Sequence, residues 1–238
     1  MKLENRLIVI ILSVILIFII TTTISFYIFP NYNQNNTSFS VAESNNLLLS
    51  NNDYGSVVKM GPYGNSSSKV KIAYIIGVHP LESKSHQAIS ESILSQKSLK
   101  YCYYIYKINV TAAANNYNDG RMNGQLLAEK YAIPDIISNK FNLAIDIHSN
   151  VGNWEENRFI FSPVKGGDSE SIALMIKNKI SWLKYYVSPN PTSTKFVTSP
   201  LIQSNVPAII YETYKYEQYD TTRNHADEFV SVIDNLNF

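Results

Sequence analysis

The sequence contains a single cysteine, Cys102, among its 238 residues. One thiol cannot form an intramolecular disulfide or a multi-thiolate metal site, so disulfide scaffolds, zinc fingers and iron–sulfur clusters are excluded. Glycine is also scarce, with nine residues. The sequence shows no glycine-rich phosphate-binding loop, which argues against a nucleotide-dependent enzyme. Any chemistry in this chain must therefore come from other residue types.

Charged residues are few as well, at 16% of the chain, and the 20 basic residues nearly balance the 19 acidic ones. A typical soluble protein has about a quarter of its residues charged. The resulting net charge of +1 creates no strong field that would attract nucleic acid or an anionic membrane surface. The composition therefore predicts no nucleic-acid partner.

The N-terminal region carries an uncharged hydrophobic segment, Leu7–Phe29. At about 1.5 Å per residue, an α-helix of this length spans a hydrocarbon core of about 30 Å. Lys2 and Arg6 precede the segment, so the positive-inside rule places residues 1–6 in the cytoplasm and the rest of the chain outside it. A cleaved signal peptide is the alternative, but its apolar region is shorter and ends in a small-x-small site, which is not visible before Pro30. We therefore expect a single-pass cell-membrane protein, anchored in the lipid bilayer and with its catalytic domain extracytoplasmic.

Residues 30–54 are rich in Asn and Ser, which predicts a flexible tether. Residues 55–238 then provide enough chain for one well-buried core. Strand-like apolar segments are expected at residues 69–78, 101–110, 143–147, 158–162 and 208–211. Amphipathic helices are expected at residues 85–97, 124–140 (interrupted near Pro134), 169–184 and 222–236. This alternation predicts an α/β domain with a central mixed, largely parallel sheet flanked by helices.

Three of the expected strands lead into residues that bind metals or transfer protons. His79 and Glu82 follow the first strand, His148 follows the third, and Glu212 follows the last. Ligands of open α/β sheets bind beyond the carboxyl ends of the strands, so these side chains are expected to meet. Two imidazoles and one carboxylate hold Zn²⁺ with one coordination position open, as in catalytic zinc sites. We therefore predict that His79, Glu82 and His148 bind one Zn²⁺ and that Glu212 acts on water as a general base.

Each of these residues also has a purely structural interpretation. A His-x-x-Glu pattern arises by chance, and a single histidine or glutamate more often makes a structural hydrogen bond or salt bridge. The joint placement at strand ends favours the metal site. His86 and His225 lie on predicted helices, and we interpret them as surface or packing residues. We expect Asp146, two residues before His148, to point to the opposite face of the strand and to stabilise the sheet rather than to orient His148, although a contact with this histidine stays open.

The segments Gly77–Glu82, Asp146–Ser149 and Pro207–Glu212 together resemble the three signatures of the zinc carboxypeptidases. The similarity is greatest to the compact branch that includes succinylglutamate desuccinylase and aspartoacylase. The resemblance implies a zinc metallohydrolase with a mixed sheet between helices. It also implies the same three zinc ligands and the same glutamate as general base.

The family further binds the substrate carboxylate and polarises its carbonyl with an Arg and an adjacent Asn–Arg pair. Arg121 and Asn123 match this substrate-binding set best, although the adjacent pair itself is absent. The resemblance also implies a catalytic tyrosine, for which Tyr185, Tyr186 and Tyr214 are the candidates.

These observations predict a membrane-anchored zinc hydrolase that cleaves an amide bond, as a metallocarboxypeptidase acting on extracytoplasmic or cell-wall peptides. Hydrolysis of small N-acyl amino acids is an alternative, but the predicted location favours a peptide because such metabolites are usually cytosolic. A catalytically silent binding module or an envelope domain is the other alternative. A silent domain is expected to lose a metal ligand or Glu212, and all four residues are present.

Overall fold

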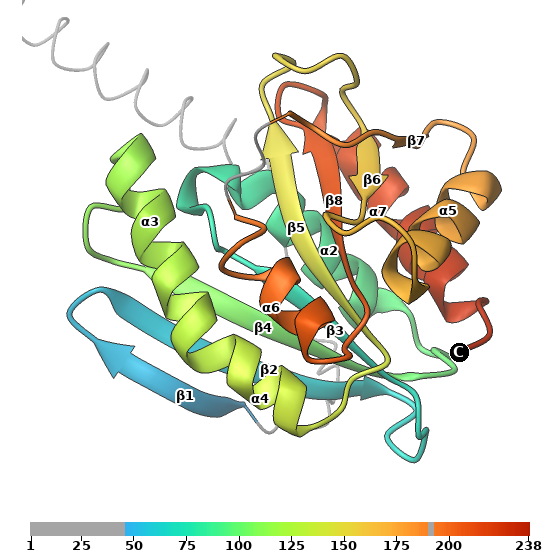
Figure 1. The fold of residues 1–238 in the computed structure, drawn as a ribbon, viewed down its shortest axis with the longest axis horizontal. Helices are drawn as coiled ribbons and strands as arrows, with labels where there is room; N and C mark the ends of the chain where they lie inside the picture. Colours follow the sequence, from blue (N-terminus) through green and yellow to red (C-terminus); the bar gives the residue numbers. More distant parts are fainter. Residues whose placement is uncertain (1–45, 190–192) are drawn as a thin grey trace, which may run out of the picture. The chain divides into compact units, whose positions relative to one another are not determined.

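The computed structural model describes residues 46–189 and 193–238 (Figure 1), which belong to one compact unit. The predicted membrane segment Leu7–Phe29 and the preceding residues 1–6 lie outside the described residues, as does most of the predicted tether. Their assignment stays a prediction. Within the two described ranges, no helix combines the length and the hydrophobicity that a bilayer crossing requires.

A single eight-stranded sheet forms the centre of the unit, in the order β1-β2-β4-β3-β5-β8-β6-β7. The strands are β1 Leu47–Asn52, β2 Gly55–Gly64, β3 Lys71–Ile76, β4 Cys102–Val110, β5 Leu143–Asn150, β6 Phe159–Phe161, β7 Lys184–Tyr185 and β8 Ala208–Tyr214. The four central strands β4, β3, β5 and β8 run parallel, whereas β1, β2 and β6 each pair antiparallel with a neighbour. The prediction of a mixed sheet with a parallel centre is confirmed.

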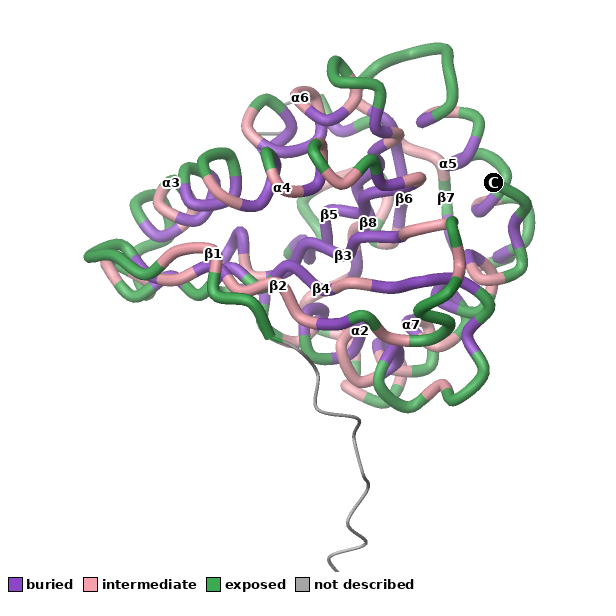
Figure 2. Tube along the Cα trace, turned by 90° about the horizontal axis from the view of Figure 1, so that it is seen from below, coloured by how far each residue is buried: buried purple, intermediate pink, exposed green. Residues whose placement is uncertain are grey.

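Helices cover both faces of this sheet (Figure 2). The helical segments are a 3₁₀ turn Pro80–Glu82 (η1), α2 Ser83–Ser95, α3 Tyr117–Leu127, a π-helical turn Ala128–Ala132 (η2), α4 Ile133–Ser138, α5 Asp168–Lys179, α6 Thr198–Gln203 and α7 Tyr219–Asp234. Residues of α2, α5 and α7 share one buried apolar cluster with the sheet, and residues of α3, α4 and α6 share another. The unit therefore has three layers, with the sheet in the middle.

The central strand β5 shows where this architecture departs from simple hydrophobic burial. All eight of its residues are buried, and strands buried on both faces are normally continuous apolar runs. Asp146 and His148 interrupt the run. A buried charge is costly unless it is paired or coordinates a metal. The two residues therefore mark the carboxyl end of β5 as a functional position.

The hairpin of β1 and β2 was not predicted. Leu47–Asn52 falls within the predicted tether, so the folded unit begins before the expected boundary at Gly55. β1 forms the edge of the sheet, where Leu47 and Leu48 are exposed. An edge strand with a polar end carries little of the hydrophobic pattern by which strands are recognised.

The helix expected at residues 124–140 starts earlier than predicted and is not broken at Pro134. Asn116 caps α3 by accepting hydrogen bonds from two backbone N–H groups with its side chain, which allows the helix to begin at Tyr117. Pro134 lies in the first turn of α4, directly after the π-helical turn. Proline lacks an N–H group, and the first turn of a helix tolerates this absence.

The loop between β8 and α7 is held in place by Glu217, whose side chain is only 5% exposed. Its carboxylate accepts hydrogen bonds from Arg158 Nε (2.7 Å) and Thr222 Oγ1 (3.1 Å), and His225 Nδ1 lies 3.7 Å away. Burial opposes ionisation, but the contacts with His225 and Arg158 outweigh it and lower the pKa of Glu217 below its usual value. The carboxylate therefore stabilises the loop in its charged form.

Glu217→Gln is expected to lower the free energy of unfolding at pH 7 by about 1–3 kcal/mol, because it removes a charged hydrogen-bond acceptor. The pKa of Glu217 is lower in the folded protein than in the unfolded chain, so its ionised carboxylate stabilises the fold above about pH 4.3, the unfolded pKa. This contribution to the free energy of unfolding is lost as the pH falls through the folded pKa. The difference from wild type should therefore shrink toward acid in urea unfolding at pH 7, 5 and 4. Glu129→Gln, at an exposed position, is the control. A deficit for the Glu217→Gln variant that is independent of pH would contradict this role.

Candidate active site

The three predicted metal ligands meet at the carboxyl ends of β3 and β5. His79 follows β3, Glu82 ends η1, and His148 lies in β5; all three are buried. One ligand atom from each residue can be chosen so that all lie within 4.8 Å of one another. Glu82 Oε1 is 3.1 Å from His79 Nδ1, and Glu82 Oε2 is 3.0 Å from His148 Nδ1. This donor set fits a divalent cation such as Zn²⁺.

The turn after β3 explains how His79 and Glu82 reach the same point. Gly77 has a φ of +85°, and a Cβ there would lie 1.9 Å from the carbonyl oxygen of Ile108. Only glycine therefore fits the sharp exit from the strand. Pro80 then starts η1, and side chains three residues apart in a 3₁₀ turn lie on the same side. The His-x-x-Glu spacing is thus matched to this turn.

Helix α3 supplies two further contacts to the cluster. Arg121 Nη1 lies 2.8 Å from Glu82 Oε1, and the amide nitrogen of Gln125 lies 3.1 Å from His79 Nε2. Residues four apart share one helix face. Gly124, between them, permits the approach because a Cβ there would lie 2.0 Å from the carbonyl oxygen of Val78. The sequence interpretation missed Gln125, whose contact with His79 depends on how α3 packs against the turn after β3.

Asp146 lies directly behind His148, and our expectation for it was wrong. Residues two apart in a strand point to the same face, and His148 Nε2 is 2.9 Å from Asp146 Oδ2. Glu82 and Asp146 therefore flank the two ring nitrogens of His148. A carboxylate on the far nitrogen fixes the orientation of a ligating histidine and makes it more basic. Its position beside Nε2 therefore allows Asp146 to orient His148 in addition to its place in the sheet.

The electrostatics of this cluster favour a positive charge between the carboxylates. Burial opposes charge on His148, but Asp146 and Glu82 outweigh it and raise its pKa well above the usual value. Burial and the nearby His148 lower the pKa of His79 to about 4. Burial also opposes charge on Glu82, yet the two histidines outweigh it and lower its pKa well below its usual range. The two carboxylates thus favour positive charge at His148, and a divalent cation bound by His148 and Glu82 would lie in the same negative field.

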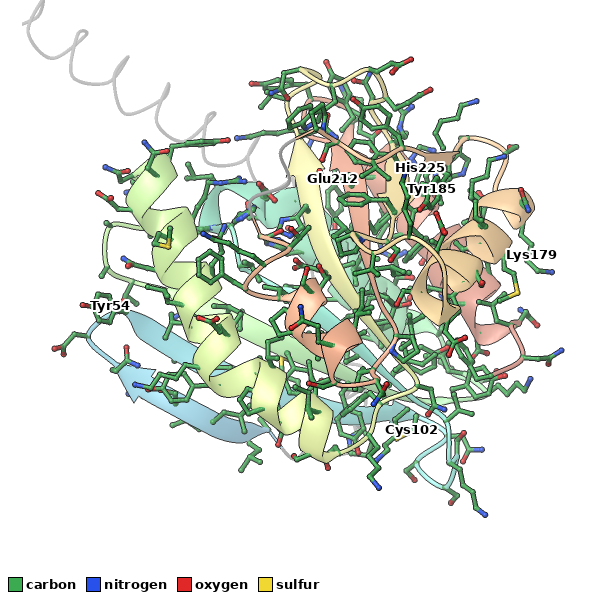
Figure 3. All side chains as sticks on the ribbon, in the orientation of Figure 1. Tyr54, Cys102, Lys179, Tyr185, Glu212 and His225 are labelled. Atoms are coloured by element: carbon green, nitrogen blue, oxygen red, sulfur yellow. The ribbon has the colours of Figure 1, made fainter. Side chains whose placement is uncertain are left out.

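Glu212 faces the same space from β8. It is the register partner of His148 across the parallel β5–β8 pair, and it lines a cavity of about 300 Å³ with His79, Glu82 and Arg121. In Figure 3, Glu212 lies toward the carboxyl ends of the central strands. Burial raises the pKa of Glu212 to about 8. The structure therefore brings together the residues predicted as ligands, base and Arg121.

Asn123, the other predicted substrate-binding residue, lies away from this cavity. Its side-chain amide donates a hydrogen bond to the carbonyl oxygen of Ala112 (3.0 Å). It lines a different cavity, next to Tyr54. Two residues along a helix rotate a side chain by about 200°, so Asn123 and Arg121 cannot share a face. A substrate contact for Asn123 has no support in this geometry.

The three candidate tyrosines are also absent from the wall of the cavity in the part of the chain that the structure describes. Tyr185 donates a hydrogen bond to Glu170, and Tyr186 packs against Phe159. The ring of Tyr214 faces that of Tyr216 at an angle of 82°. The tyrosine that does line the cavity is Tyr117, which sequence reasoning did not select.

The remaining histidines have structural contacts, as predicted. His86 is buried in α2, and its Nε2 lies 3.1 Å from the carbonyl oxygen of Ile147. Burial lowers the pKa of His86 to about 4, so this ring is neutral. His225 stacks on Trp182 with ring centroids 3.9 Å apart. Neither side chain joins the candidate metal ligands.

Comparison with known proteins gives matches at the level of structure. No protein-family model and no curated protein sequence matches the chain. A metallo-carboxypeptidase from Burkholderia cenocepacia superposes with a TM-score of 0.56 and 10% identity, covering 82% of this chain and 65% of that one. A metallo-carboxypeptidase from Pseudomonas aeruginosa, solved with (2-guanidinoethylmercapto)succinic acid, gives 0.52 and 11%, covering 75% and 60%. The described chain has the metallo-carboxypeptidase fold.

A protein from Shewanella denitrificans described as a candidate metallopeptidase gives a TM-score of 0.51 and 14% identity, covering 79% of this chain and 81% of that one. The chain thus spans less than two thirds of the two carboxypeptidases and most of this smaller protein. At such identities the likeness establishes the fold. The chemistry has to be argued from the residues of this chain.

Proposed function

We propose that this protein is a zinc-dependent hydrolase that cleaves an amide bond in the manner of a metallocarboxypeptidase. One observation carries the proposal: the buried cluster of His79, Glu82 and His148 shares a cavity with Glu212 on a metallo-carboxypeptidase fold. A metal-dependent amide hydrolase needs a site for a Lewis acid and a separate base that reaches water. The four residues supply both from three different strand ends.

Glu212 is the proton carrier in this proposal. A bound Zn²⁺ would act as a Lewis acid, making water more acidic and polarising the scissile carbonyl. The Glu212 carboxylate accepts a proton as water attacks the carbonyl carbon, and it passes that proton to the amide nitrogen as the C–N bond breaks. The acyl group thereby gains the hydroxyl and the amine gains the proton. A nearby cation would also lower the pKa of Glu212 from about 8 and keep the base ionised at neutral pH.

Arg121 supports the same reaction from α3. Its guanidinium holds Glu82 through the 2.8 Å ion pair and reaches the cavity wall. In this position it would stabilise negative charge that develops on the substrate carbonyl oxygen.

The protein is expected to contain close to one zinc per chain and to hydrolyse short peptides with free C-termini. Full-length protein in detergent would be analysed for metal content and assayed against such peptides and against N-acyl amino acids. Turnover of only the second set would favour the deacylase alternative. Protein that remains metal-free in added zinc would remove the basis of the proposal, and zinc-loaded protein without turnover would favour a binding module.

We also propose that Leu7–Phe29 anchors the protein in the cell membrane with the hydrolase domain outside the cytoplasm, where extracytoplasmic or cell-wall peptides are the substrates. The support is the uncharged segment and the preceding Lys2 and Arg6. Protease added to intact cells should then remove the domain and leave the N-terminus protected. Recovery of the domain in the medium at a shortened mature size would indicate a cleaved signal peptide instead.

A further inference from the structure

Lys215 is a positively charged residue that lines the active-site cavity, and it has no role in the reaction proposed above. It follows β8, three residues after Glu212, and lines the same cavity. Its backbone N–H donates to the carbonyl oxygen of Asn150 (2.8 Å), which fixes its position next to the end of β5. The residue is partly buried, and within residues 46–189 and 193–238 its ammonium group makes no hydrogen bond or ion pair. A lysine in this state keeps its ammonium group in the water of the cavity, where it can bind an anion that enters from outside the chain.

The charges around the cavity lead to the same conclusion. Arg121 is engaged by Glu82 at 2.8 Å, so it is less available than Lys215 to a ligand. The carboxylates that line the cavity are Glu82 and Glu212, and the buried Asp146 lies beside His148. A divalent cation together with Arg121 and Lys215 carries more positive charge than these three carboxylates carry negative charge. A loaded site therefore attracts an anionic ligand, and Lys215 is the group left to bind it.

An apolar surface lines another part of this cavity. Phe161 in β6 and Ile210 in β8 belong to a small buried apolar cluster, and Trp154 packs against it. All three residues also line the cavity. Cavities of this kind combine apolar walls with a few polar groups that orient the ligand. A ligand that carries both a carboxylate and a bulky apolar side chain would satisfy Lys215 and this surface together.

We infer that Lys215 binds the free carboxylate of the substrate and that Trp154, Phe161 and Ile210 bind the side chain of the same residue. The substrates are therefore peptides or N-acyl amino acids whose carboxyl-terminal residue is aromatic or large and aliphatic. This assignment rests on the proposed function for the bond that is cleaved, but not for the binding of the carboxylate. It makes Lys215 the residue that selects free carboxylates and Trp154 the residue that selects side-chain size.

The test measures binding and kinetics on full-length, zinc-loaded protein. Calorimetry with L-phenylalanine and L-phenylalaninamide should show that the wild type binds the free acid at least about tenfold more tightly. Lys215→Met should weaken binding of the acid by roughly 10–100-fold, as expected for loss of a charged hydrogen bond, and leave the amide unchanged. Lys215→Arg should restore most of the affinity because it keeps the charge. Lys179→Met is the matched control, since Lys179 is exposed on α5 and far from Glu212 (Figure 3).

A second variant addresses the side-chain surface. Trp154→Ala should reduce the preference for L-phenylalanine over L-alanine by about tenfold, because it removes the aromatic contact with the phenyl ring. Its affinity for the carboxylate group should persist, so L-alanine should bind as in the wild type. An unchanged preference would overturn the assignment of Trp154.

Failure of this inference and failure of the proposed function give different results. If the wild type hydrolyses peptides but Lys215→Met leaves KM for free-acid peptides unchanged, the role of Lys215 is overturned and the hydrolase stands. Equal binding of acid and amide by the wild type would overturn it too. If binding depends on Lys215 but no amide is cleaved, the carboxylate site stands and the hydrolase proposal fails.

Discussion

Glu212→Gln is expected to lower turnover by about 10²–10⁴-fold, the usual effect of losing a general base, and to leave zinc binding and the fold intact. The amide has nearly the shape of the carboxylate but cannot accept a proton at neutral pH. Glu212 is separate from the three candidate ligands, so its replacement should not release the metal. Steady-state hydrolysis, metal content and the unfolding temperature, measured on one preparation, would distinguish these effects.

The partly buried position of Glu212 allows a competing structural role, and the same experiment separates the two. The amide of Asn150 lies 3.5 Å from Glu212 Oε2, so a structural carboxylate would show its loss as a lower unfolding temperature, with turnover falling only in proportion to folded protein. Glu155→Gln, at an exposed position next to Trp154, controls for the change of charge near the cavity. Wild-type turnover in a folded, zinc-loaded Glu212→Gln variant would remove Glu212 from the mechanism.

His148→Ala is expected to weaken zinc binding by more than about 100-fold, because even outer-shell partners of a metal site cost 10–100-fold and His148 is a candidate ligand. The site would retain one imidazole and one carboxylate, too few for tight binding. Added zinc should raise the unfolding temperature of the wild type and not that of the variant. Competition with a chromogenic chelator gives the affinity directly.

Loss of His148 also leaves Asp146 buried without its partner, so the variant could unfold for a reason unrelated to zinc. His79→Ala supplies the second measurement, since His79 is not in contact with Asp146 and its loss should weaken zinc binding to a similar extent. His225→Ala, which replaces a histidine outside the cluster, controls for the general effect of removing an imidazole. Tight zinc binding by the folded His79→Ala and His148→Ala variants would exclude the proposed site.

The sequence was sufficient for the placement of His79, Glu82, His148 and Glu212 because each follows a strand that its own apolar residues identify. Once these strands are assigned to a parallel sheet, their carboxyl ends meet on one edge. The convergence therefore follows from local patterns combined with a general rule of topology. Arg121 was found through a resemblance, and its contact with Glu82 depends on the path of α3.

Contacts that depend on packing between distant elements were not predictable in this way. Gln125 reaches His79 because Gly124 lets α3 lie against the turn after β3. The local sequence pattern does not predict this close packing. Trp154 and Lys215 lie in a loop and just after a strand, where side-chain direction is set by tertiary structure. The placement of Asp146 was different, since strand alternation alone predicts that it shares a face with His148.

The separation of Glu82 and His148 by 66 residues gives a bound ion a mechanical role. Between these residues the chain forms α2, the sheet strand β4 and the helical segment of α3 to α4. An ion held by both residues would act as a reversible cross-link that closes this long loop and ties β3 to β5. An ion bound only by the folded chain stabilises it by mass action. Scarcity of zinc would then reduce catalytic capacity and resistance to unfolding together.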